Sequence, residues 1–587
     1  MNALKTARPA AAGRAIVKTL LLGCLLLLCA PPDGAQAQTK QLLNYPTIVK
    51  PVLGEQGMVV SQSAPATQIG RDILRKGGNA VDAAIATAFA LAVTLPRAGN
   101  IGGDGFMLIH LAREARTVAI DYRTVAPAAA RFELYVREDG SISPDAKAGV
   151  LSAGVPGTVA GLALAHERYG KLPWRELLKP AIALAKDGVE LTRDEAWVLE
   201  WGRERLNRSA AGKAAFFKPD GSAYRAGERL RQPDLAWSLR QIANHGADAF
   251  YRGPIAQRLA AGMAASGGLV TMADLAAYRA IERPALTGTY RGLQIATMPP
   301  SSGGGASVIE MLNILEQFDL EKAGAGSAEA LHLIAESMKL AFHDRRRHAG
   351  DTDHDDVPLT ALTSKPYAQE RARQIVRGRV MAPEALSAGN PWAFESRETT
   401  HLSVLDAEGN AVSNTFTLGS DFGSGVMMPG TGFLLGNMIG NFSLSEQRAS
   451  MPGGTPLTAN VLGPGRRPVS SMSPTMVLRE GKPLLITGSP GGSTIPGTVA
   501  QMIVNVFDFG MTVAEATHAP RIYQNIDDGK LYLERGISPD TRTLLQSWGH
   551  NLVVDETIGS TQSIMRTDTL VEGSADPRRP GSAALEQ

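Results

Sequence analysis

The residues with the clearest chemical potential are two threonines at the start of the segment Thr399-Thr400-His401. A threonine within a chain is a weak nucleophile, because its hydroxyl stays protonated near neutral pH. If the bond between Glu398 and Thr399 is cut, Thr399 gains a free α-amine, whose pKa is roughly 7.7–8.0 in small peptides. That amine can accept the hydroxyl proton, as in N-terminal threonine nucleophiles. Taken alone, the pair is also explained by the frequency of threonine in strands.

A predicted hairpin over residues 401–418 brings a second hydroxyl to this position. Two short strands flank a four-residue polar loop. If Asp406 pairs with Ala411, Thr417 lies opposite Thr400 and next to the candidate nucleophile. Its hydroxyl can then hydrogen-bond the nucleophile, although a shift of the register by one residue would change this pairing.

A glycine-rich run, Gly488-Ser489-Pro490-Gly491-Gly492-Ser493, follows the apolar stretch Pro483–Ile486 and precedes a helical pattern. Successive amides before a helix can converge on an anion. Gly491 and Gly492 are therefore candidates for an oxyanion hole, which needs donors fixed where negative charge develops. An ordinary strand-to-helix turn is the alternative. The pair Ser470-Ser471 supplies further short donors.

Several other functions are disfavoured by the composition. A net charge of +2 without a basic block argues against a nucleic-acid binder. The chain lacks a phosphate-binding G-x-x-x-x-G-K-[ST] motif, an H-E-x-x-H motif and a G-x-S-x-G elbow. With 2 cysteines and no pair of histidines four residues apart on a predicted helix, the sequence shows no metal-binding pattern.

The first 37 residues have the pattern of a signal peptide. Basic residues precede the apolar run 19–30, and Ala35-Gln36-Ala37 fits a cleavage site. The run is short for a membrane span, although an uncleaved anchor is the alternative. Both cysteines leave with this segment, which excludes a cysteine nucleophile from the mature chain. We expect a periplasmic or secreted protein without a membrane segment once the signal is removed.

The periodicity of the remaining chain predicts mixed helices and strands. Residues 63–95 are predicted to form two helices, separated at Gly77-Gly78, with Asn79 as the N-cap of the second. Residues 107–110 and 117–122 are predicted strands, and the region 150–350 is mostly helical in pattern. Residues 386–398 read as a polar connector, after which strand and turn signals dominate.

These motifs resemble those of the γ-glutamyltransferases, also called glutathione hydrolases, which are N-terminal-nucleophile hydrolases. The run Thr399-Thr400-His401-Leu402-Ser403-Val404 resembles their autoprocessing site. The resemblance covers about residues 57–580 and includes the motifs Gly77-Gly78-Asn79-Ala80-Val81-Asp82, Ile101-Gly102-Gly103-Asp104-Gly105-Phe106, Asp121-Tyr122-Arg123, Met298-Pro299-Pro300-Ser301-Ser302-Gly303, Arg466-Arg467-Pro468-Val469-Ser470-Ser471-Met472, Gly488-Ser489-Pro490-Gly491-Gly492, Ala519-Pro520-Arg521 and Asp576-Pro577-Arg578.

The resemblance implies an α+β fold of the αββα type, with two stacked, mainly antiparallel sheets between helical layers. It implies self-cleavage between Glu398 and Thr399 into two interwoven subunits, 38–398 and 399–587. The matching positions give Thr399 as the nucleophile with Thr417 as its support, and Gly491 and Gly492 as the oxyanion hole. They also give Arg123, assisted by Ser470 and Ser471, as the group that holds the carboxylate of a γ-glutamyl substrate such as glutathione. The acyl group then passes to water or to an amino acid, and the implied mechanism needs no metal and no organic cofactor.

Three positions depart from the family pattern. Asn441 stands where the family normally has an acid that pairs with the substrate's α-ammonium, while Met438 and Gly419 replace common polar residues nearby. A neutral hydrogen bond contributes about 1 kcal/mol, against roughly 1.5–3 kcal/mol for a charge-assisted one. A glutaryl- or cephalosporin-type acylase, whose substrate lacks that amine, is therefore the alternative to a γ-glutamyl enzyme. A non-catalytic exported binding protein is a third hypothesis.

Overall fold

The computed structural model describes residues 47–139, 141–381, 399–444, 459–555 and 557–587. The predicted signal peptide, the connector 386–398 and Glu398 lie outside the described residues. All of the described helices and strands lie within Pro51–Gln587. None of these helices is both long enough and apolar enough to span a bilayer.

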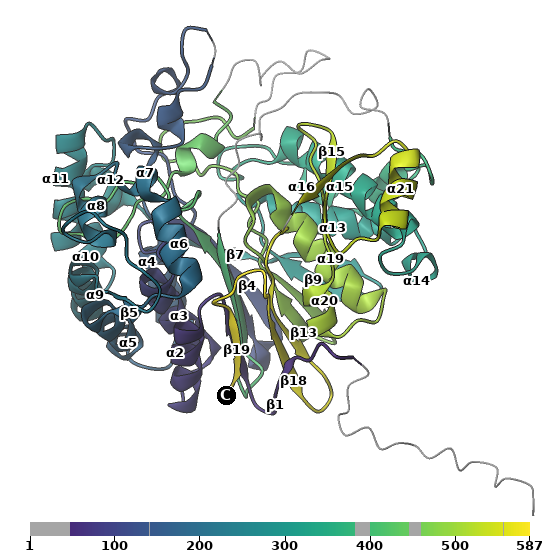
Figure 1. The fold of residues 1–587 in the computed structure, drawn as a ribbon, viewed down its shortest axis with the longest axis horizontal. Helices are drawn as coiled ribbons and strands as arrows, with labels where there is room; N and C mark the ends of the chain where they lie inside the picture. The colour runs from purple at the N-terminus through teal and green to yellow at the C-terminus, as the bar shows by residue number, and fades with distance from the viewer. Residues whose placement is uncertain (1–46, 140, 382–398, 445–458, 556) are drawn as a thin grey trace, which may run out of the picture. The chain divides into compact units, whose positions relative to one another are not determined.

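Two seven-stranded sheets form the centre of the molecule (Figure 1). Every strand pair in both sheets is antiparallel. The first sheet has the order β19 (Ala583–Glu586), β2 (Met58–Ser61), β10 (Thr400–Leu405), β11 (Ala411–Thr417), β3 (Asp104–Leu111), β4 (Arg116–Asp121) and β7 (Ile281–Pro284). The second has the order β1 (Val52–Gly54), β18 (Val571–Ala575), β17 (Gln562–Arg566), β13 (Lys482–Thr487), β12 (Thr475–Arg479), β9 (Leu293–Thr297) and β8 (Leu286–Tyr290).

Helices cover the outer face of each sheet (Figure 1). The helices packed on the first sheet include α2 (Ala64–Arg75), α3 (Ala80–Thr94), α4 (Thr158–Tyr169), α5 (Trp174–Asp187), α9 (Pro233–His245), α10 (Asp248–Tyr251), α11 (Pro254–Ser266) and α12 (Met272–Ala277). Those on the second include α13 (Gly303–Leu315), α14 (Leu320–Ala323), α15 (Ala328–His348), α17 (Lys365–Ala372), α19 (Ile495–Phe507), α20 (Val513–His518) and α21 (Pro539–Ser547). This is the layered α+β arrangement that the resemblance implies.

The smaller elements lie at the periphery of the two sheets. A three-stranded sheet contains β14 (Ile522–Gln524), β15 (Lys530–Glu534) and β16 (Asn551–Asp555), and a two-stranded sheet contains β5 (Val189–Glu190) and β6 (Arg229–Leu230). The remaining helices are α6 (Arg193–Trp201), α7 (Arg203–Leu206), α8 (Ala210–Phe216) and α16 (Leu359–Leu362).

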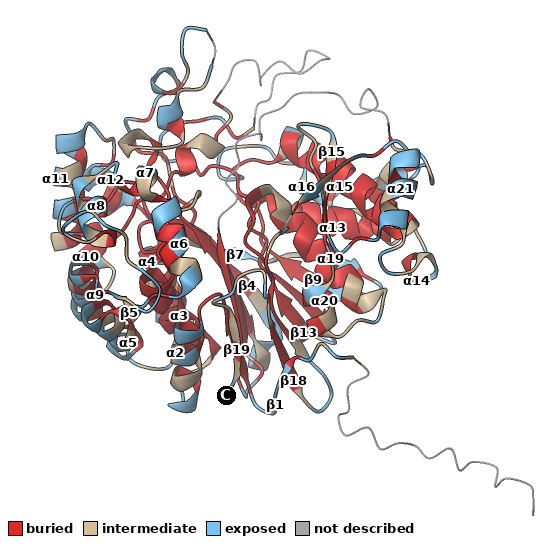
Figure 2. Cartoon of the chain, viewed as in Figure 1, coloured by how far each residue is buried: buried red, intermediate tan, exposed pale blue. Residues whose placement is uncertain are grey.

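The central strands are buried on both faces (Figure 2). Along β3, Met107 and Ile109 pack with the helices of the first sheet, whereas Phe106 and Leu108 pack against the second sheet. This alternation follows from the two-residue period of a strand. Since both faces need apolar side chains, the strand reads as a continuous apolar run after Asp104.

The first helical pair forms as predicted. Asn79 caps α3 through a capping box: its side chain accepts a hydrogen bond from the N–H of Asp82 at 3.0 Å, and Asp82 accepts one from the N–H of Asn79 at 3.1 Å. Gly77 adopts a φ of 87° between the helices, which favours glycine. The predicted helix near 494–508 is also confirmed, as α19.

The hairpin of β10 and β11 is confirmed, but its register differs by one residue from the predicted one. Ala411 pairs with Leu405, so the predicted pair of Ala411 and Asp406 is wrong. The reason is that Asp406 belongs to the turn. Its carboxylate accepts hydrogen bonds from the backbone N–H groups of Asn410 and Ala80, both at 2.9 Å. A residue anchored in this way does not extend the strand.

Candidate active site

Thr399 lies immediately before β10 and beside Thr417, the last residue of β11. Thr400 pairs with Phe416, so one further step in the ladder sets Thr417 opposite Thr399, and not opposite Thr400 as predicted. The two hydroxyl oxygens are 3.4 Å apart. The N–H of Gly419 donates to Thr417 Oγ1 at 2.8 Å, which fixes that hydroxyl beside Thr399. The corrected register therefore brings the predicted pair closer together.

The alternation along β10 directs the Thr399 hydroxyl into the space between the sheets. Leu402 packs with the helices of the first sheet, so Thr399 and His401 point to the opposite side. Ser403, on that same side, donates to the carbonyl of Gln562 in β17 at 2.8 Å. The inner face of this hairpin is thus a polar strip that contacts the second sheet.

His401 is close to Thr399 in sequence but is not arranged to act as its base. Its Nδ1 lies 2.8 Å from Thr415 Oγ1 and its Nε2 lies 3.1 Å from Ser403 Oγ. Burial lowers the pKa of His401 to about 3, so the ring stays neutral at physiological pH. Within the described part of the chain, no basic or acidic side chain is hydrogen-bonded to Thr399. This geometry is compatible with its own α-amine as the proton acceptor.

The predicted oxyanion loop, which begins at Gly488, starts next to the inner face of the β10–β11 hairpin. Thr487, the last residue of β13, accepts a hydrogen bond from Ser413 Oγ of β11 at 2.9 Å. Gly488 lies against the imidazole of His401, because a Cβ added at Gly488 would be 2.3 Å from the ring atom Cε1. The loop therefore starts over the same face of the first sheet that carries Thr399.

Gly491 and Gly492 follow in a conformation that requires glycine. Their φ angles are 130° and 57°, and both residues are buried. Among the described residues, we find no acceptor for either amide N–H. Two buried donors without a partner are what an oxyanion hole needs. No described contact joins either glycine to Thr399, so their role remains a prediction.

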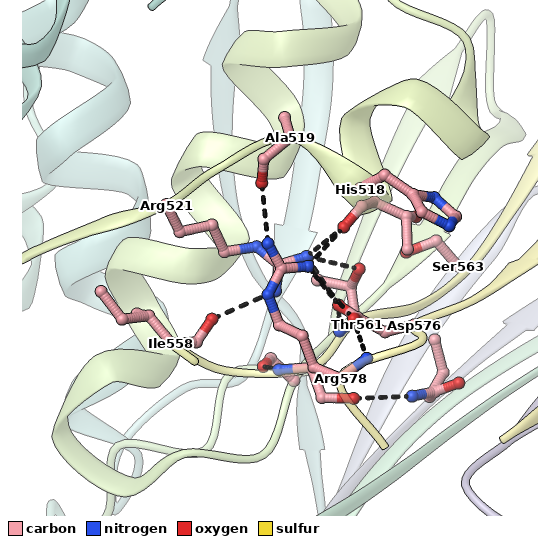
Figure 3. A network of polar contacts seen from close by, with 12 residues as sticks. His518, Ala519, Arg521, Ile558, Thr561, Ser563, Asp576 and Arg578 are labelled. Carbon is pink, nitrogen blue, oxygen red and sulfur yellow. Dashed lines mark hydrogen bonds and ion pairs between the residues drawn. The ribbon is translucent and has the colours of Figure 1, made fainter. Parts of the chain in front are cut away.

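A buried ion-pair network supports this loop and is formed by two of the sequence motifs (Figure 3). Arg521 Nη2 lies 2.7 Å from Asp576 Oδ2, and the two side chains are 2% and 0% exposed. Arg521 Nη1 also donates to the carbonyl of Ile558 at 3.1 Å. Two residues later, the N–H of Ser560 donates to Ser489 Oγ at 2.9 Å. The network therefore holds this segment against the glycine loop.

Arg123, the predicted carboxylate ligand, already binds a carboxylate of the chain itself. Its Nη1 donates to Asp104 Oδ1 at 2.9 Å and to Oδ2 at 3.0 Å. Its Nε donates to the carbonyl of Pro468 at 2.9 Å, and its Nη2 to that of Val469 at 3.1 Å. The arginine and aspartate side chains are 1% and 0% exposed. Asp104 pairs with Thr417 in the ladder of β3 and β11, which links this ion pair to the nucleophile.

Sequence reasoning did not identify Asp104 as a site residue. A usable signal was present, however, since an acid at the start of a buried apolar strand needs a cationic partner. Arg123 lies two residues after the end of the neighbouring strand β4, and Asp104 at the start of β3 lies at the same end of that strand pair. The two residues are separated in sequence by a hairpin, so only the strand pairing brings them together.

The other predicted binding residues gather around the same arginine. Ser470 follows Val469, one of the carbonyl partners of Arg123. The side chain of Asn460 joins this segment to Asn441, because its Oδ1 accepts from the N–H of Val469 at 3.0 Å and its Nδ2 donates to the carbonyl of Asn441 at 2.8 Å. The Asn441 side chain itself has no hydrogen-bond partner among the described residues.

The hydroxyls of Ser471 and Ser470 accept hydrogen bonds from different groups. Its hydroxyl accepts a hydrogen bond from Arg345 Nη2 of α15 at 2.5 Å. The hydroxyl of Ser470 accepts from the N–H of Met472 at 3.1 Å. Both serines thus directly follow Pro468 and Val469, whose carbonyls bind Arg123, but each serine hydroxyl has a hydrogen-bond partner within the chain.

The other two departures from the family pattern lie against each other. A Cβ at Gly419 would be 2.0 Å from Asn437 Oδ1 and 3.1 Å from Met438 Sδ. Gly419 also has a φ of 96°, a conformation that side chains disfavour. Any larger residue at this position would therefore require a different path of the 436–441 segment.

One cluster of side chains has ligand chemistry suited to a metal ion. His332, Glu336 and His550 bring one nitrogen or oxygen each within 4.8 Å of one another. All three are occupied within the chain, however. His332 Nδ1 lies 2.8 Å from His550 Nε2, and Glu336 accepts from Lys339 Nζ at 2.6 Å and from the N–H of Met381 at 2.8 Å. In this structure the three side chains form a hydrogen-bond network.

Comparison with known proteins agrees with this geometry. The sequence profile of the γ-glutamyltranspeptidase family matches residues 66–586. A glutathione hydrolase proenzyme of Escherichia coli strain K12 is 44% identical, with 97% of this chain and 98% of the relative covered. The acylase ACY 1 proenzyme of Pseudomonas sp. strain SE83 is 37% identical, covering 89% of this chain and 91% of the relative.

A solved structure shares the fold. The crystal structure of a cephalosporin acylase from Bacillus halodurans superposes with a TM-score of 0.81 at 30% identity, covering 93% of this chain and 98% of that one. The layered sheets, the paired threonines and the glycine loop thus occur in a chain whose relatives match it almost from end to end. This chain belongs to the γ-glutamyltranspeptidase family.

Proposed function

We propose that this protein is a self-processing threonine-nucleophile enzyme that cleaves γ-glutamyl amides such as glutathione and transfers the acyl group to water or to an amino acid. The observation that carries the proposal is the pair of hydroxyls of Thr399 and Thr417, held 3.4 Å apart at the head of β10 in a member of this family. The relatives named glutathione hydrolase proenzymes support γ-glutamyl amides as the donors.

In the proposed reaction, the free α-amine of Thr399 takes the proton from Oγ1 while Oγ1 attacks the γ-carbonyl carbon. The N–H groups of Gly491 and Gly492 stabilise the oxyanion. The protonated amine then gives its proton to the leaving amine as the amide bond breaks, which leaves an ester on Thr399. Water or an amino acid attacks this ester and releases the acyl group. Each step uses only groups of the chain and the substrates.

The α-amine requires cleavage between Glu398 and Thr399. The Thr399 hydroxyl attacks its own preceding carbonyl, the acyl group passes from the amide nitrogen to Oγ1 as an ester, and water then hydrolyses that ester. The products would be the subunits 38–398 and 399–587. The strand order supports their staying together after cleavage. In the first sheet, β10 and β11 lie between β2 and β3, and in the second, β12 pairs with β9. Both sheets therefore contain neighbouring strands from each subunit, and separation would break both ladders.

A second candidate function is a glutaryl- or cephalosporin-type acylase with the same threonine chemistry. Asn441 favours it, because an amide has no charge to pair with an α-ammonium. The rates on γ-glutamyl and glutaryl anilides with one leaving group decide between the two. A ratio near one would mean that the amine is not recognised, whereas a strong preference for the γ-glutamyl donor would reject the acylase alternative.

We further propose that residues 1–37 direct export to the periplasm or the cell exterior and are then removed. The sequence pattern of that segment supports this location. Fractionation of cells that express the full chain, followed by sequencing of the protein's N-terminus, tests it. A chain that stays in the cytoplasm and begins at Met1 would contradict the proposal.

The central experiment measures release of p-nitroaniline from γ-glutamyl-p-nitroanilide by the purified protein, with Thr399→Ala as the control. A denaturing gel should show two bands for the wild type and one for the variant, and the smaller wild-type band should begin at Thr399. Turnover no higher than that of the variant would reject the enzyme, and a single band would favour the non-catalytic binding protein.

A further inference from the structure

The ion pair of Arg123 and Asp104 has no role in the reaction described above. Each of the three guanidinium nitrogens donates a hydrogen bond within the chain, and both carboxylate oxygens of Asp104 accept one from Arg123. The N–H of Thr124 adds a further bond to Asp104 Oδ2 at 2.9 Å. A carboxylate thus occupies the guanidinium that a substrate carboxylate would need.

The position of the pair connects it to the acyl group of the substrate. Thr399, Thr417 and Asp104 lie in consecutive order across β10, β11 and β3. Since neighbouring strands are about 4.8 Å apart, Asp104 lies two strand spacings, roughly 10 Å, from Thr399. An acyl group bound to Thr399 and extending over β11 would point its far end towards Arg123 and Asp104.

We propose that Asp104 is a specificity-determining residue: it occupies Arg123 as an internal competitor, so that a carboxylate at the far end of the acyl group adds little to the binding of a donor. This inference rests on the proposed function, because it concerns the donor of that reaction. It adds the residue that limits how much the carboxylate of a γ-glutamyl or glutaryl donor contributes to binding.

The free-energy cost of replacing Asp104 by a donor carboxylate at Arg123 supports this assignment. A donor carboxylate can reach Arg123 only if Asp104 gives up its ion pair, and breaking a buried pair leaves an uncompensated buried charge. Burial already raises the pKa of Asp104, although Arg123 opposes that effect. An uncharged end leaves the pair intact. The nearby Asn441 adds no charge that would compensate a bound α-ammonium.

Three p-nitroanilides with one leaving group test the proposal. They carry the γ-glutamyl group, the glutaryl group, and the 4-carbamoylbutanoyl group, in which an uncharged amide replaces the glutaryl carboxylate. For the wild type, we expect kcat/KM on the carbamoyl donor to equal or exceed that on the glutaryl donor. A preference of tenfold or more for the glutaryl donor would overturn the proposal.

Asp104→Asn keeps the size of the side chain and an oxygen for the N–H of Thr124, but removes the charge that competes for Arg123. We expect the ratio of glutaryl to carbamoyl kcat/KM to rise at least about tenfold, because the donor gains a charge-assisted hydrogen bond. The change should come from a lower KM for both carboxylate donors. A fall in this ratio, or a loss confined to the γ-glutamyl donor, would instead mean that Asp104 binds the donor's ammonium.

Asp576→Asn is the matched control, since it breaks another buried arginine–aspartate pair away from the acyl group. It should lower stability without changing the ratio between donors. If Asp104→Asn does not fold, Asp104→Ser is the second variant, and the wild-type comparison of donors still tests the proposal.

A measurement independent of turnover separates this inference from the proposed function. Free glutarate should raise the melting temperature of the Asp104→Asn protein but not that of the wild type or of Asp576→Asn. Equal shifts in all three proteins would refute the role of Asp104, even if none of the anilides is cleaved. Absence of turnover on every anilide, matching Thr399→Ala, would refute the proposed function alone.

Discussion

Replacing Thr417 by valine tests how the nucleophile is tuned. Valine preserves the branched shape and removes only the hydroxyl, which lies 3.4 Å from Thr399 Oγ1 and accepts from the N–H of Gly419 at 2.8 Å. We expect slower acyl transfer and slower self-cleavage, because both reactions use the same Thr399 hydroxyl as the attacking group.

The magnitude follows from the two lost contacts. A neutral hydrogen bond to the nucleophile contributes about 1 kcal/mol, and one to a developing negative charge roughly 1.5–3 kcal/mol. At about 1.4 kcal/mol per tenfold change, kcat should fall by a factor of about 5 to 150. The N–H of Gly419 loses its acceptor as well, so the free energy of unfolding should decrease by about 1–3 kcal/mol.

Thr415→Val provides the matched control. Thr415 has the same side chain on the same face of β11, but its hydroxyl contacts Nδ1 of His401 at 2.8 Å and not Thr399. Steady-state rates on one anilide, together with the time course of subunit formation on a gel, compare the two variants. If Thr417→Val retains kcat within twofold of Thr415→Val, the second hydroxyl does not assist the nucleophile and our interpretation of the pair is wrong.

Three further predictions concern the surroundings of the site. Burial lowers the pKa of His401 from 6.5 to about 3, so between these pH values the unfolded chain binds a proton at His401 and the folded chain does not. The melting temperature should therefore fall as the pH decreases from about 6.5 towards 3, and His401→Gln should flatten this slope. Gly491→Ala should lower kcat more than it changes KM, because alanine is strained at a φ of 130° and relaxation would move the amide donors; steady-state kinetics check this. Asp576→Asn should reduce the free energy of unfolding in urea by about 3–5 kcal/mol, because it leaves Arg521 buried without its carboxylate.

Local signals were sufficient to predict much of the fold. The N-cap at Asn79 and the hairpin around Gly409 depend on residues close in sequence, and both are confirmed. The register of that hairpin was not predictable from strand alternation alone, because it depends on whether Asp406 joins the strand or the turn. The backbone donors that hold Asp406 in the turn include the N–H of Ala80, which is remote in sequence.

The candidate site shows the same limit more strongly. Thr399, Thr417, Gly491 and Gly492 could be predicted as site residues because a nucleophile, a second hydroxyl and a glycine-rich turn together suit one kind of chemistry. The partnership of Asp104 with Arg123 was not foreseen, since charge pairing across strands leaves no periodic pattern in the sequence. The contact between His332 and His550 is similar, because it joins α15 to a residue more than two hundred positions later.

The state of the glycine loop links stability to catalysis. Two buried amides without acceptors are expected to cost about 1–3 kcal/mol each, because their donors have lost water and gained nothing. Such a loop would relax if its backbone were free to move, and the amides would then turn towards solvent or a carbonyl. The Arg521–Asp576 pair, acting through the segment at Ser560 and the Ser489 hydroxyl, opposes that relaxation. The motifs that contain Arg521 and Asp576 are therefore best understood as the groups that hold the amides of Gly491 and Gly492, the predicted oxyanion hole, in place.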